Sequence, residues 1–294
     1  MEATAGLRSH LSLWIDCEKI TRRPRNLLQL PQRCRGEKTR ILVSGHMQLK
    51  RRPDNHRLEG LKVSCSFQNQ VPGSVLDSKS LPTSLDEATI LKSKSEEIEQ
   101  VLDGQCVYLV GMMGSGKTTV GKVLADALGY SFIDSDKLIE DAAEGTPVAE
   151  IFKRYGESFF RDSETDVLRK LCTMQRNIIS TGGGIVTRPI NWKYMHKGIS
   201  LWLDVPLEAL ARRIVAAGTK TRPLLHQESG DIYLKTLTRL TNLMTERSES
   251  YENADVRISF ENIAAKLGCD DVCNLTPTVI AIEALVQIDN FLRK

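Results

Sequence analysis

Residues 106–128 read CVYLVGMMGSGKTTVGKVLADAL and contain three features in one unbroken stretch. The apolar run at 106–110 predicts a short buried strand. Gly111 to Thr118 matches the pattern G-x-x-x-x-G-K-[ST], in which backbone amides surround phosphate oxygens. Apolar residues then recur at helical spacing through Leu128, and Gly129 is a typical helix stop. A strand, a glycine-rich loop and a helix in this order predict a nucleoside triphosphate site.

Individual residues of this loop have expected roles. The amide groups and the N-terminus of the following helix favour negative charge, so the loop is expected to hold phosphate. Glycines at 111, 114 and 116 allow a backbone conformation and a close approach that side chains would block. Lys117 is expected to face the β- and γ-phosphates, and Thr118 is expected to bind Mg²⁺. The motif alone indicates the nucleotide and leaves the acceptor open.

The rest of the chain alternates apolar strands with helices. Further strands are expected at 130–134, 178–180, 199–203 and 256–260. Helices are expected at 146–152, at 206–215 and from 276 onward. Such alternation predicts a mostly parallel sheet with helices on both faces. The polar stretch 218–231 interrupts the pattern and is expected to form a flap, with a plain surface loop as the alternative.

Four further features are candidates for the acceptor site, and each has a plain structural alternative. They are Asp134 with Asp136, Arg161 with Glu164, the triplet Gly182-Gly183-Gly184, and Arg222 in the polar flap. The aspartates follow a strand, where ligands gather in α/β sheets, but helix caps would explain them too. The Arg-Glu pair is equally consistent with a surface ion pair, and the triple glycine with a tight turn. Their joint occurrence behind a phosphate loop favours a binding site.

Basic residues are concentrated at the N-terminus. Residues 1–60 hold 13 basic and 6 acidic residues, whereas residues 101–294 hold 23 basic and 25 acidic. The net charge of +3 therefore does not favour nucleic-acid binding by the folded body. An arginine-rich, acid-poor leader predicts a cleaved organelle-targeting peptide, with a retained tail and a nucleic-acid-binding arm as alternatives. Apart from a short helix at Glu87 to Leu102, no packed element is expected before about residue 100, so residues before about 95 are expected to be dispensable.

Composition and cysteine spacing exclude several classes of protein. Apolar residues make up 41% and charged residues 26%, which is typical of globular chains. The longest apolar runs, such as Ile199 to Leu203, are far too short to span a bilayer, so no membrane partner is expected. Seven cysteines at irregular spacings, without matching histidines, predict free thiols and neither a zinc site nor a disulfide framework.

Six motifs in order produce a specific family resemblance. They are Gly111 to Lys117, Phe132-Ile-Asp134-Ser-Asp136, Phe160-Arg161-x-x-Glu164, Thr181-Gly-Gly-Gly184, Arg222-Pro-Leu-Leu225 and Arg247-x-x-x-Tyr251. Together they resemble the shikimate kinase family over about residues 104–292. The basic leader and the segment 191–198 resemble the plant, chloroplast-targeted form.

The resemblance implies a fold and a reaction. The fold is an α/β, nucleoside-monophosphate-kinase-like P-loop fold: a five-stranded parallel sheet with a shikimate-binding subdomain and a LID. The reaction is transfer of the ATP γ-phosphoryl group to the 3-hydroxyl of shikimate, in aromatic amino-acid (chorismate) biosynthesis. ATP and shikimate are the expected ligands, with Mg²⁺ as the cofactor.

The resemblance also implies site residues. The ATP phosphates are expected to be bound by residues 114–119, which include Ser115 and Thr119. Thr118 is expected to bind Mg²⁺ directly, and Asp134 is expected to reach the metal through water. For the substrate, Arg161 and Arg247 are expected on the carboxylate and Asp136 on the ring hydroxyls, with Gly182, Gly183 and Gly184 close by. Arg222 is expected to close over the nucleotide, so Lys117, Asp136 and Arg222 are the expected catalytic residues. The adenine contact is not assigned, because the segment 262–276 departs from the bacterial pattern.

The domain organisation follows from these features. Residues 1–65 are expected to be a chloroplast transit peptide read by the plastid import machinery, 66–100 a linker or short helix, and 101–294 the kinase domain. The expected location is the plastid stroma, and a monomer and a homodimer both stay open. Two rival functions are a related small-molecule kinase, such as one for gluconate, and a catalytically inactive relative with a regulatory role. The second should have lost motif residues, yet Lys117 and Asp136 are present.

Overall fold

The computed structural model describes residues 84–217 and 231–294. The expected leader at 1–65, Arg222 and most of the expected flap lie outside the described residues. In chain order the elements are α3 (Ser84–Leu102), β1 (Val107–Val110), α4 (Lys117–Leu128), β2 (Ser131–Asp134), α5 (Ser135–Ala142), α6 (Val148–Leu171), β3 (Asn177–Ser180), η1 (Ile185–Thr187), α7 (Pro189–Met195), β4 (Ile199–Asp204), α8 (Leu207–Ala217), α9 (Ile232–Tyr251), β5 (Val256–Ser259), α10 (Phe260–Leu267), η3 (Val272–Asn274) and α11 (Pro277–Leu292).

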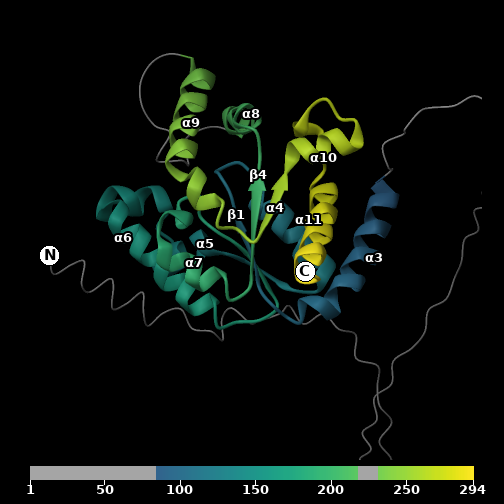
Figure 1. Ribbon diagram of the computed structural model, residues 1–294. Coiled ribbons are helices and arrows are strands. Elements are labelled where there is room, and N and C mark those ends of the chain that lie inside the picture. Colours follow the sequence, from purple (N-terminus) through teal and green to yellow (C-terminus); the bar gives the residue numbers. More distant parts are fainter. Residues whose placement is uncertain (1–83, 218–230) are drawn as a thin grey trace, which may run out of the picture. The chain divides into compact units, whose positions relative to one another are not determined.

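The five strands form one parallel sheet in the order β2-β3-β1-β4-β5. Every residue of β1 and β3 is buried, as expected for central strands that are covered on both faces. Figure 1 shows α3, α4 and α11 on one side of the sheet and α5, α6 and α7 on the other. The predicted five-stranded parallel sheet with helices on both faces is therefore confirmed.

The strand order places three functional loops side by side. In a parallel sheet all strands end at the same edge, so the segments that follow β1, β2 and β3 leave from neighbouring positions. These segments carry the phosphate loop after Val110, the aspartates at Asp134 and Asp136, and the glycine triplet after Ser180. The fold thus assembles the site from stretches far apart in sequence.

Helix ends agree with the local sequence signals. Gly129 follows α4 in the left-handed conformation, with φ of 62°, and its amide bonds back to the last turn. Thr276 caps α11 by accepting a hydrogen bond from the Val279 amide, and Pro277 is the first helical residue. These two predictions are confirmed, and the expected strands are present with ends shifted by about one residue.

The helix expected at 146–152 differs from the structure. It begins at Val148, after Pro147 at the cap position, and it continues to Leu171. Gly156 interrupts it with φ of 82° and ψ of 169°, a conformation that is not helical. The buried residues beyond this break, such as Phe159 and Leu168, keep the helical spacing that sustains the second half.

Helix α3 packs onto the folded body and spans the expected boundary between residues 100 and 101. The helix predicted at Glu87 to Leu102 is present, begins at Ser84, and packs against α11 and α4. Ile98 and Leu102 are fully buried, and the Glu87 carboxylate accepts a 2.8 Å hydrogen bond from the Thr276 hydroxyl. A helical stripe of this kind contributes to the core, so a boundary at about residue 100 would cut through a packed element. The helix was missed as a core element because its apolar stripe is narrow.

Membrane-spanning helices and disulfides are absent from the part of the chain that the structure describes. No helix in 84–217 or 231–294 combines the length and the apolar character needed to cross a bilayer. The four cysteines in these ranges, Cys106, Cys172, Cys269 and Cys273, are free thiols, as predicted.

Candidate active site

The phosphate loop is shaped by its glycines and by Lys117. Gly111, Gly114 and Gly116 have φ values of 148°, 81° and 94°, which confirms the predicted need for glycine in this loop. The Lys117 ammonium group curls back over the loop and donates to the carbonyl groups of Gly111 (2.8 Å) and Met112 (2.9 Å). A buried positive charge and a helix N-terminus thus meet at the point where phosphate is expected.

Three side-chain oxygens cluster beside the loop. The Thr118 hydroxyl donates to Oδ2 of Asp134 at 3.2 Å, and its Oγ1 lies 3.5 Å from Oγ of Ser180. These residues come from α4, β2 and β3 and are brought together by the sheet order. Hydroxyl and carboxylate oxygens are the ligands that Mg²⁺ prefers, and this cation typically takes one or two carboxylates together with substrate phosphates and water. In the described ranges there is no cluster of three or more His, Cys, Asp or Glu residues that could hold a metal ion.

Asp134 and Asp136 have different surroundings. Asp134 is the N-cap of α5, because its Oδ1 accepts from the amides of Asp136 (3.1 Å) and Lys137 (3.4 Å). The helix-cap alternative is therefore correct for one oxygen of Asp134, while the other oxygen contacts Thr118. Asp136 lies in the first turn, is not a cap, and has a buried Oδ1 without a hydrogen-bond partner among the described residues.

Arg161 forms a buried ion pair, and the surface-pair alternative is wrong. Its Nη1 donates to Oε2 of Glu164 at 2.7 Å, and the two side chains are 9% and 0% exposed. Its Nη2 donates to Glu157 at 2.9 Å. Glu157 and Glu164 are four residues before and three residues after Arg161 on α6, so all three side chains share one helix face and can pair. The other oxygen of Glu164, Oε1, has no partner among the described residues.

The glycine triplet allows these charged groups to meet. A Cβ atom on Gly182 would lie 2.5 Å from Oε1 of Glu164 and 2.8 Å from Oδ1 of Asp136. A Cβ atom on Gly184 would collide with the guanidinium of Arg161. Both unpartnered carboxylate oxygens therefore converge on Gly182, and the tight-turn alternative does not account for this close approach.

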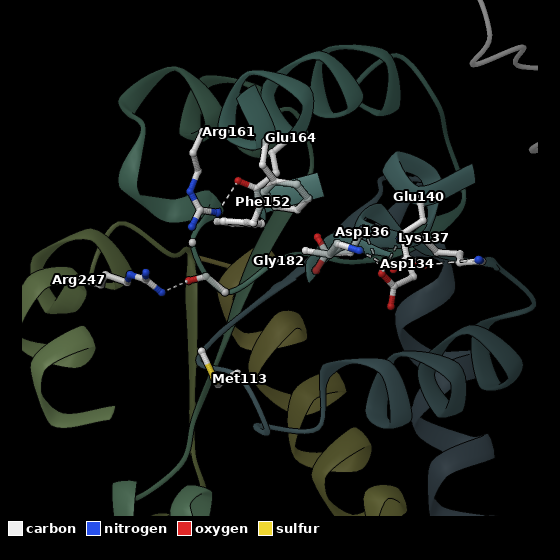
Figure 2. Close-up of a pocket in the computed structure, with 14 residues that line it drawn as sticks. Met113, Asp134, Asp136, Lys137, Glu140, Phe152, Arg161, Glu164, Gly182 and Arg247 are labelled. Atoms are coloured by element: carbon white, nitrogen blue, oxygen red, sulfur yellow. Dashed lines mark hydrogen bonds and ion pairs between the residues drawn. The ribbon is translucent and has the colours of Figure 1, made fainter. Parts of the chain in front are cut away.

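A cavity of about 400 Å³ lies among these groups. Its lining residues are Met113, Asp134, Asp136, Lys137, Glu140, Val148, Phe152, Phe160, Arg161, Glu164, Gly182, Gly183, Gly184 and Arg247. Figure 2 shows Arg161 and Arg247 on one side of the cavity, and Asp134 and Asp136 on the other. A small ligand with a negative charge at one end and hydroxyl groups at the other matches this arrangement.

The buried carboxyl groups have raised pKa values. Burial, followed by the charges of Glu164 and Asp134, raises the pKa of Asp136 to about 7, while Lys117 and Arg161 act in the opposite direction. Burial likewise raises the pKa of Glu164, although Arg161 and Arg247 oppose the shift. A carboxyl group poised near neutral pH in a cavity is suited to accept a proton from a hydroxyl group.

The structure brings together most of the predicted site residues. Asp136, Arg161, Arg247 and the glycine triplet line one cavity, and Asp134 joins it to the phosphate loop. Arg222 lies outside the described residues. Sequence reasoning missed the cavity residues Val148 and Phe152, although their spacing of four along α6 is a detectable signal. It also missed Glu140, whose carboxylate accepts from the Val148 amide at 3.0 Å and ties α5 to α6.

Comparison with known proteins agrees with this site. A model of the family described as shikimate kinase matches residues 113–276. The chain is 56% identical over 294 residues to "Shikimate kinase, chloroplastic" of Solanum lycopersicum, covering all of this chain and 97% of that protein. It is 52% identical over 297 residues to "Shikimate kinase 1, chloroplastic" of Arabidopsis thaliana, covering all of this chain and 96% of that protein.

A solved structure shows the same fold. It is described as shikimate kinase from Acinetobacter baumannii in complex with shikimate, with a TM-score of 0.54 and 32% identity. The match covers 67% of this chain and 97% of that one.

The fold and the site define a P-loop phosphotransferase of the nucleoside-monophosphate-kinase-like type. The chain belongs to the shikimate kinase family. The family and the fold predicted from the six motifs are confirmed, and the names of the tomato and Arabidopsis relatives support the predicted chloroplast location.

Proposed function

We propose that the protein catalyses ATP-dependent phosphorylation of the 3-hydroxyl of shikimate in the chloroplast, as a step of aromatic amino-acid biosynthesis. One observation carries the proposal. A phosphate loop meets a cavity at the carboxyl edge of one parallel sheet, and the cavity holds two guanidinium groups and a buried carboxyl oxygen without a partner among the described residues. Membership of the shikimate kinase family identifies the small hydroxylated acid that fits such a cavity.

Arg161 and Arg247 bind the shikimate carboxylate in this proposal. Both guanidinium groups line the cavity and are almost fully buried, so their charge is weakly screened by water. Asp136 lies across the cavity and accepts from the ring hydroxyls, as suggested by its unpartnered Oδ1. Gly182, Gly183 and Gly184 leave room for the ring.

The nucleotide lies on the phosphate loop in this proposal. Gly111, Gly114, Ser115, Gly116, Lys117, Thr118 and Thr119 supply amides, hydroxyls and one ammonium group. The oxygens of Thr118 and Asp134 fit a Mg²⁺ ion, with Thr118 as a direct ligand and Asp134 acting through water. Such an ion neutralises charge on the β- and γ-phosphates when it is bound. Arg222 stays a predicted nucleotide contact.

Phosphoryl transfer requires mainly positioning and charge stabilisation. Asp136 orients the 3-hydroxyl and takes its proton while the hydroxyl oxygen bonds to the γ-phosphorus and the bond to the ADP oxygen breaks. Lys117 moves from the carbonyl groups that it contacts in this structure to the phosphate oxygens. No covalent enzyme intermediate is needed.

ADP release measured with purified protein, ATP and Mg²⁺ tests the proposal. Shikimate should stimulate ADP formation strongly, whereas gluconate and a blank without acceptor should not. Lys117→Met, which removes the phosphate-facing charge, should abolish turnover while the protein stays folded, because one transition-state contact is worth about 3–4 kcal/mol. Equal rates with shikimate and without an acceptor would contradict the proposal.

A further inference from the structure

One backbone carbonyl in the cavity wall accepts hydrogen bonds from two side chains of the same helix. Nη1 of Arg247 donates to the Gly183 oxygen at 3.1 Å, and the Tyr251 hydroxyl donates to the same oxygen at 3.0 Å. Arg247 and Tyr251 are four residues apart on α9, so both face the glycine triplet. Figure 2 shows the Arg247 side chain directed at this loop. Gly183 and Arg247 line the cavity, whereas Tyr251 does not.

The phenol ring of Tyr251 is held in a fixed place. Tyr251 is 0% exposed, and its ring stacks on the Trp202 ring with a centroid separation of 5.4 Å and an interplanar angle of 10°. The Arg257 guanidinium lies 4.7 Å from the Trp202 centroid and also pairs with Asp204 at 2.6 Å. Trp202 belongs to β4 and Arg257 to β5, so the ring is packed against the sheet itself.

Because the ring is fixed, the Tyr251 hydroxyl is held at the Gly183 carbonyl. A buried phenol needs a partner for its O–H group, and the Gly183 carbonyl is that partner. Burial raises the pKa of Tyr251, against the opposing charge of Arg247, so the group stays a neutral donor. The carbonyl is thereby tied to the sheet through a rigid ring, and a flexible arginine is not its sole support.

We propose that Tyr251 is a positioning residue for substrate binding. It fixes the Gly183 carbonyl, and through that carbonyl it sets the place of the glycine triplet and the orientation of Arg247. Arg247 contacts this carbonyl through Nη1, so other N–H groups of its guanidinium can be directed at a carboxylate. The inference rests on the proposed function, since it assumes that Arg247 binds the shikimate carboxylate.

Tyr251→Phe tests the inference, because it removes the hydroxyl and keeps the stacked ring. Calorimetry on the full chain should show shikimate binding weakened about threefold to tenfold, the usual result of losing one neutral hydrogen bond. ATP affinity should stay unchanged, and KM for shikimate should rise more than kcat falls. Tyr130→Phe is the matched control: it also removes a buried phenol hydroxyl, but Tyr130 lies at the amino end of β2 and does not line the cavity, so both affinities should match the native protein.

A double-mutant cycle with Arg247→Lys separates positioning from general stability. If Tyr251 acts through Arg247, Tyr251→Phe should weaken shikimate binding less in the Arg247→Lys background than in the native one. If Tyr251 had a purely structural role, Tyr251→Phe would lower the melting temperature and weaken the binding of shikimate and ATP equally. The ratio of shikimate affinity to ATP affinity would then stay unchanged, and this ratio can be measured even in a less stable variant.

The outcomes also distinguish the inference from the proposed function. Native protein that neither binds nor phosphorylates shikimate would overturn the proposed function. Native protein that binds shikimate, together with a Tyr251→Phe variant whose shikimate affinity is unchanged or whose ATP affinity falls equally, would overturn the role of Tyr251 alone.

Discussion

The Thr118 hydroxyl donates a 3.2 Å hydrogen bond to Oδ2 of Asp134, which joins the phosphate loop to the end of β2. Asp136, two residues further on, instead turns its buried Oδ1, which has no hydrogen-bond partner among the described residues, toward Gly182. The two aspartates therefore have different surroundings, and we propose that Asp134 acts beside the nucleotide and metal and Asp136 beside the acceptor.

A Mg²⁺ titration of initial rates separates these tasks. Asn keeps the shape of Asp and still caps a helix, so Asp134→Asn should fold and should need more Mg²⁺, with partial rescue at high metal. Asp136→Asn should have low turnover at every Mg²⁺ concentration, because it lacks the base. Rescue of Asp136→Asn by metal, or identical titrations for the two variants, would show that the pair acts as one metal-binding unit.

The pKa of Asp136 produces a stability effect with a definite sign. Burial and the nearby charges of Glu164 and Asp134 raise this pKa from 3.8 to about 7, so the ionised carboxylate destabilises the folded state. The penalty grows as the pH rises from about 4 to about 7 and is complete above it. Asp136→Asn should raise the melting temperature of the ligand-free protein at pH 8 by at least about 2 °C.

The gain should be smaller at pH 5, where the native Asp136 is largely protonated in the folded state. Differential scanning fluorimetry at both pH values measures it, with Asp166→Asn on the exposed face of α6 as the control. An equal gain at pH 5 and pH 8 would mean that Asp136 is not ionising in this range. Protonation of Asp136 should also lower kcat/KM for shikimate in the native protein as the pH falls below about 7.

Neighbouring glycines should respond differently to an added methyl group. Gly182→Ala places a Cβ between Asp136 and Glu164, at 2.8 and 2.5 Å from their oxygens, and should lower the free energy of unfolding by about 1–3 kcal/mol. Gly183→Ala places its Cβ at an ordinary 3.5 Å from Gly111 and Met113, so its stability should change little. Denaturant titrations of the two variants give the comparison, and equal stability would remove the close-packing account of Gly182.

Truncation tests the boundary that α3 defines. We propose that the folded domain begins at Ser84. The 84–294 protein should then match the full chain in melting temperature and turnover, whereas a 103–294 protein should be much less stable. Loss of Ile98 and Leu102 alone removes two fully buried side chains, each worth about 1.5–3 kcal/mol. A 95–294 protein should be intermediate, because it lacks Glu87 and its bond to Thr276. Stability of 103–294 equal to that of the full chain would restore the boundary near residue 100.

Local signals in the sequence predicted the parts of the molecule that local physics determines. The phosphate loop, the glycine stop at Gly129 and the cap at Thr276 are set by a few adjacent residues, and the structure agrees with each. The alternation of strands and helices predicted the parallel sheet, which in turn places Asp134 and the glycine triplet at one edge. The position of Asp134 and the glycine triplet follows from one general rule, that the carboxyl ends of parallel strands lie at the same edge of a sheet.

Features that depend on tertiary burial could not be predicted in this way. The spacing of Arg161 and Glu164 shows that they share a helix face, yet it does not show that the face is covered. The same holds for α3, whose apolar stripe becomes part of the core because α11 and α4 lie beside it. The convergence of Tyr251 and Arg247 on Gly183 joins residues more than 60 positions apart, and no local pattern encodes that contact.

Shikimate binding to Arg161 variants tests the central claim, that this cavity holds the substrate, most directly. Arg161→Ala alone would leave Glu164 charged and buried without its partner, so the test uses Arg161→Ala/Glu164→Gln, with Glu164→Gln as the control. Calorimetric titration should show shikimate affinity of the double variant about 10- to 150-fold below that of the control, from losing a charged hydrogen bond of about 1.5–3 kcal/mol, with ATP affinity equal in both. Unchanged shikimate affinity with weakened ATP binding would contradict the account and place the substrate elsewhere.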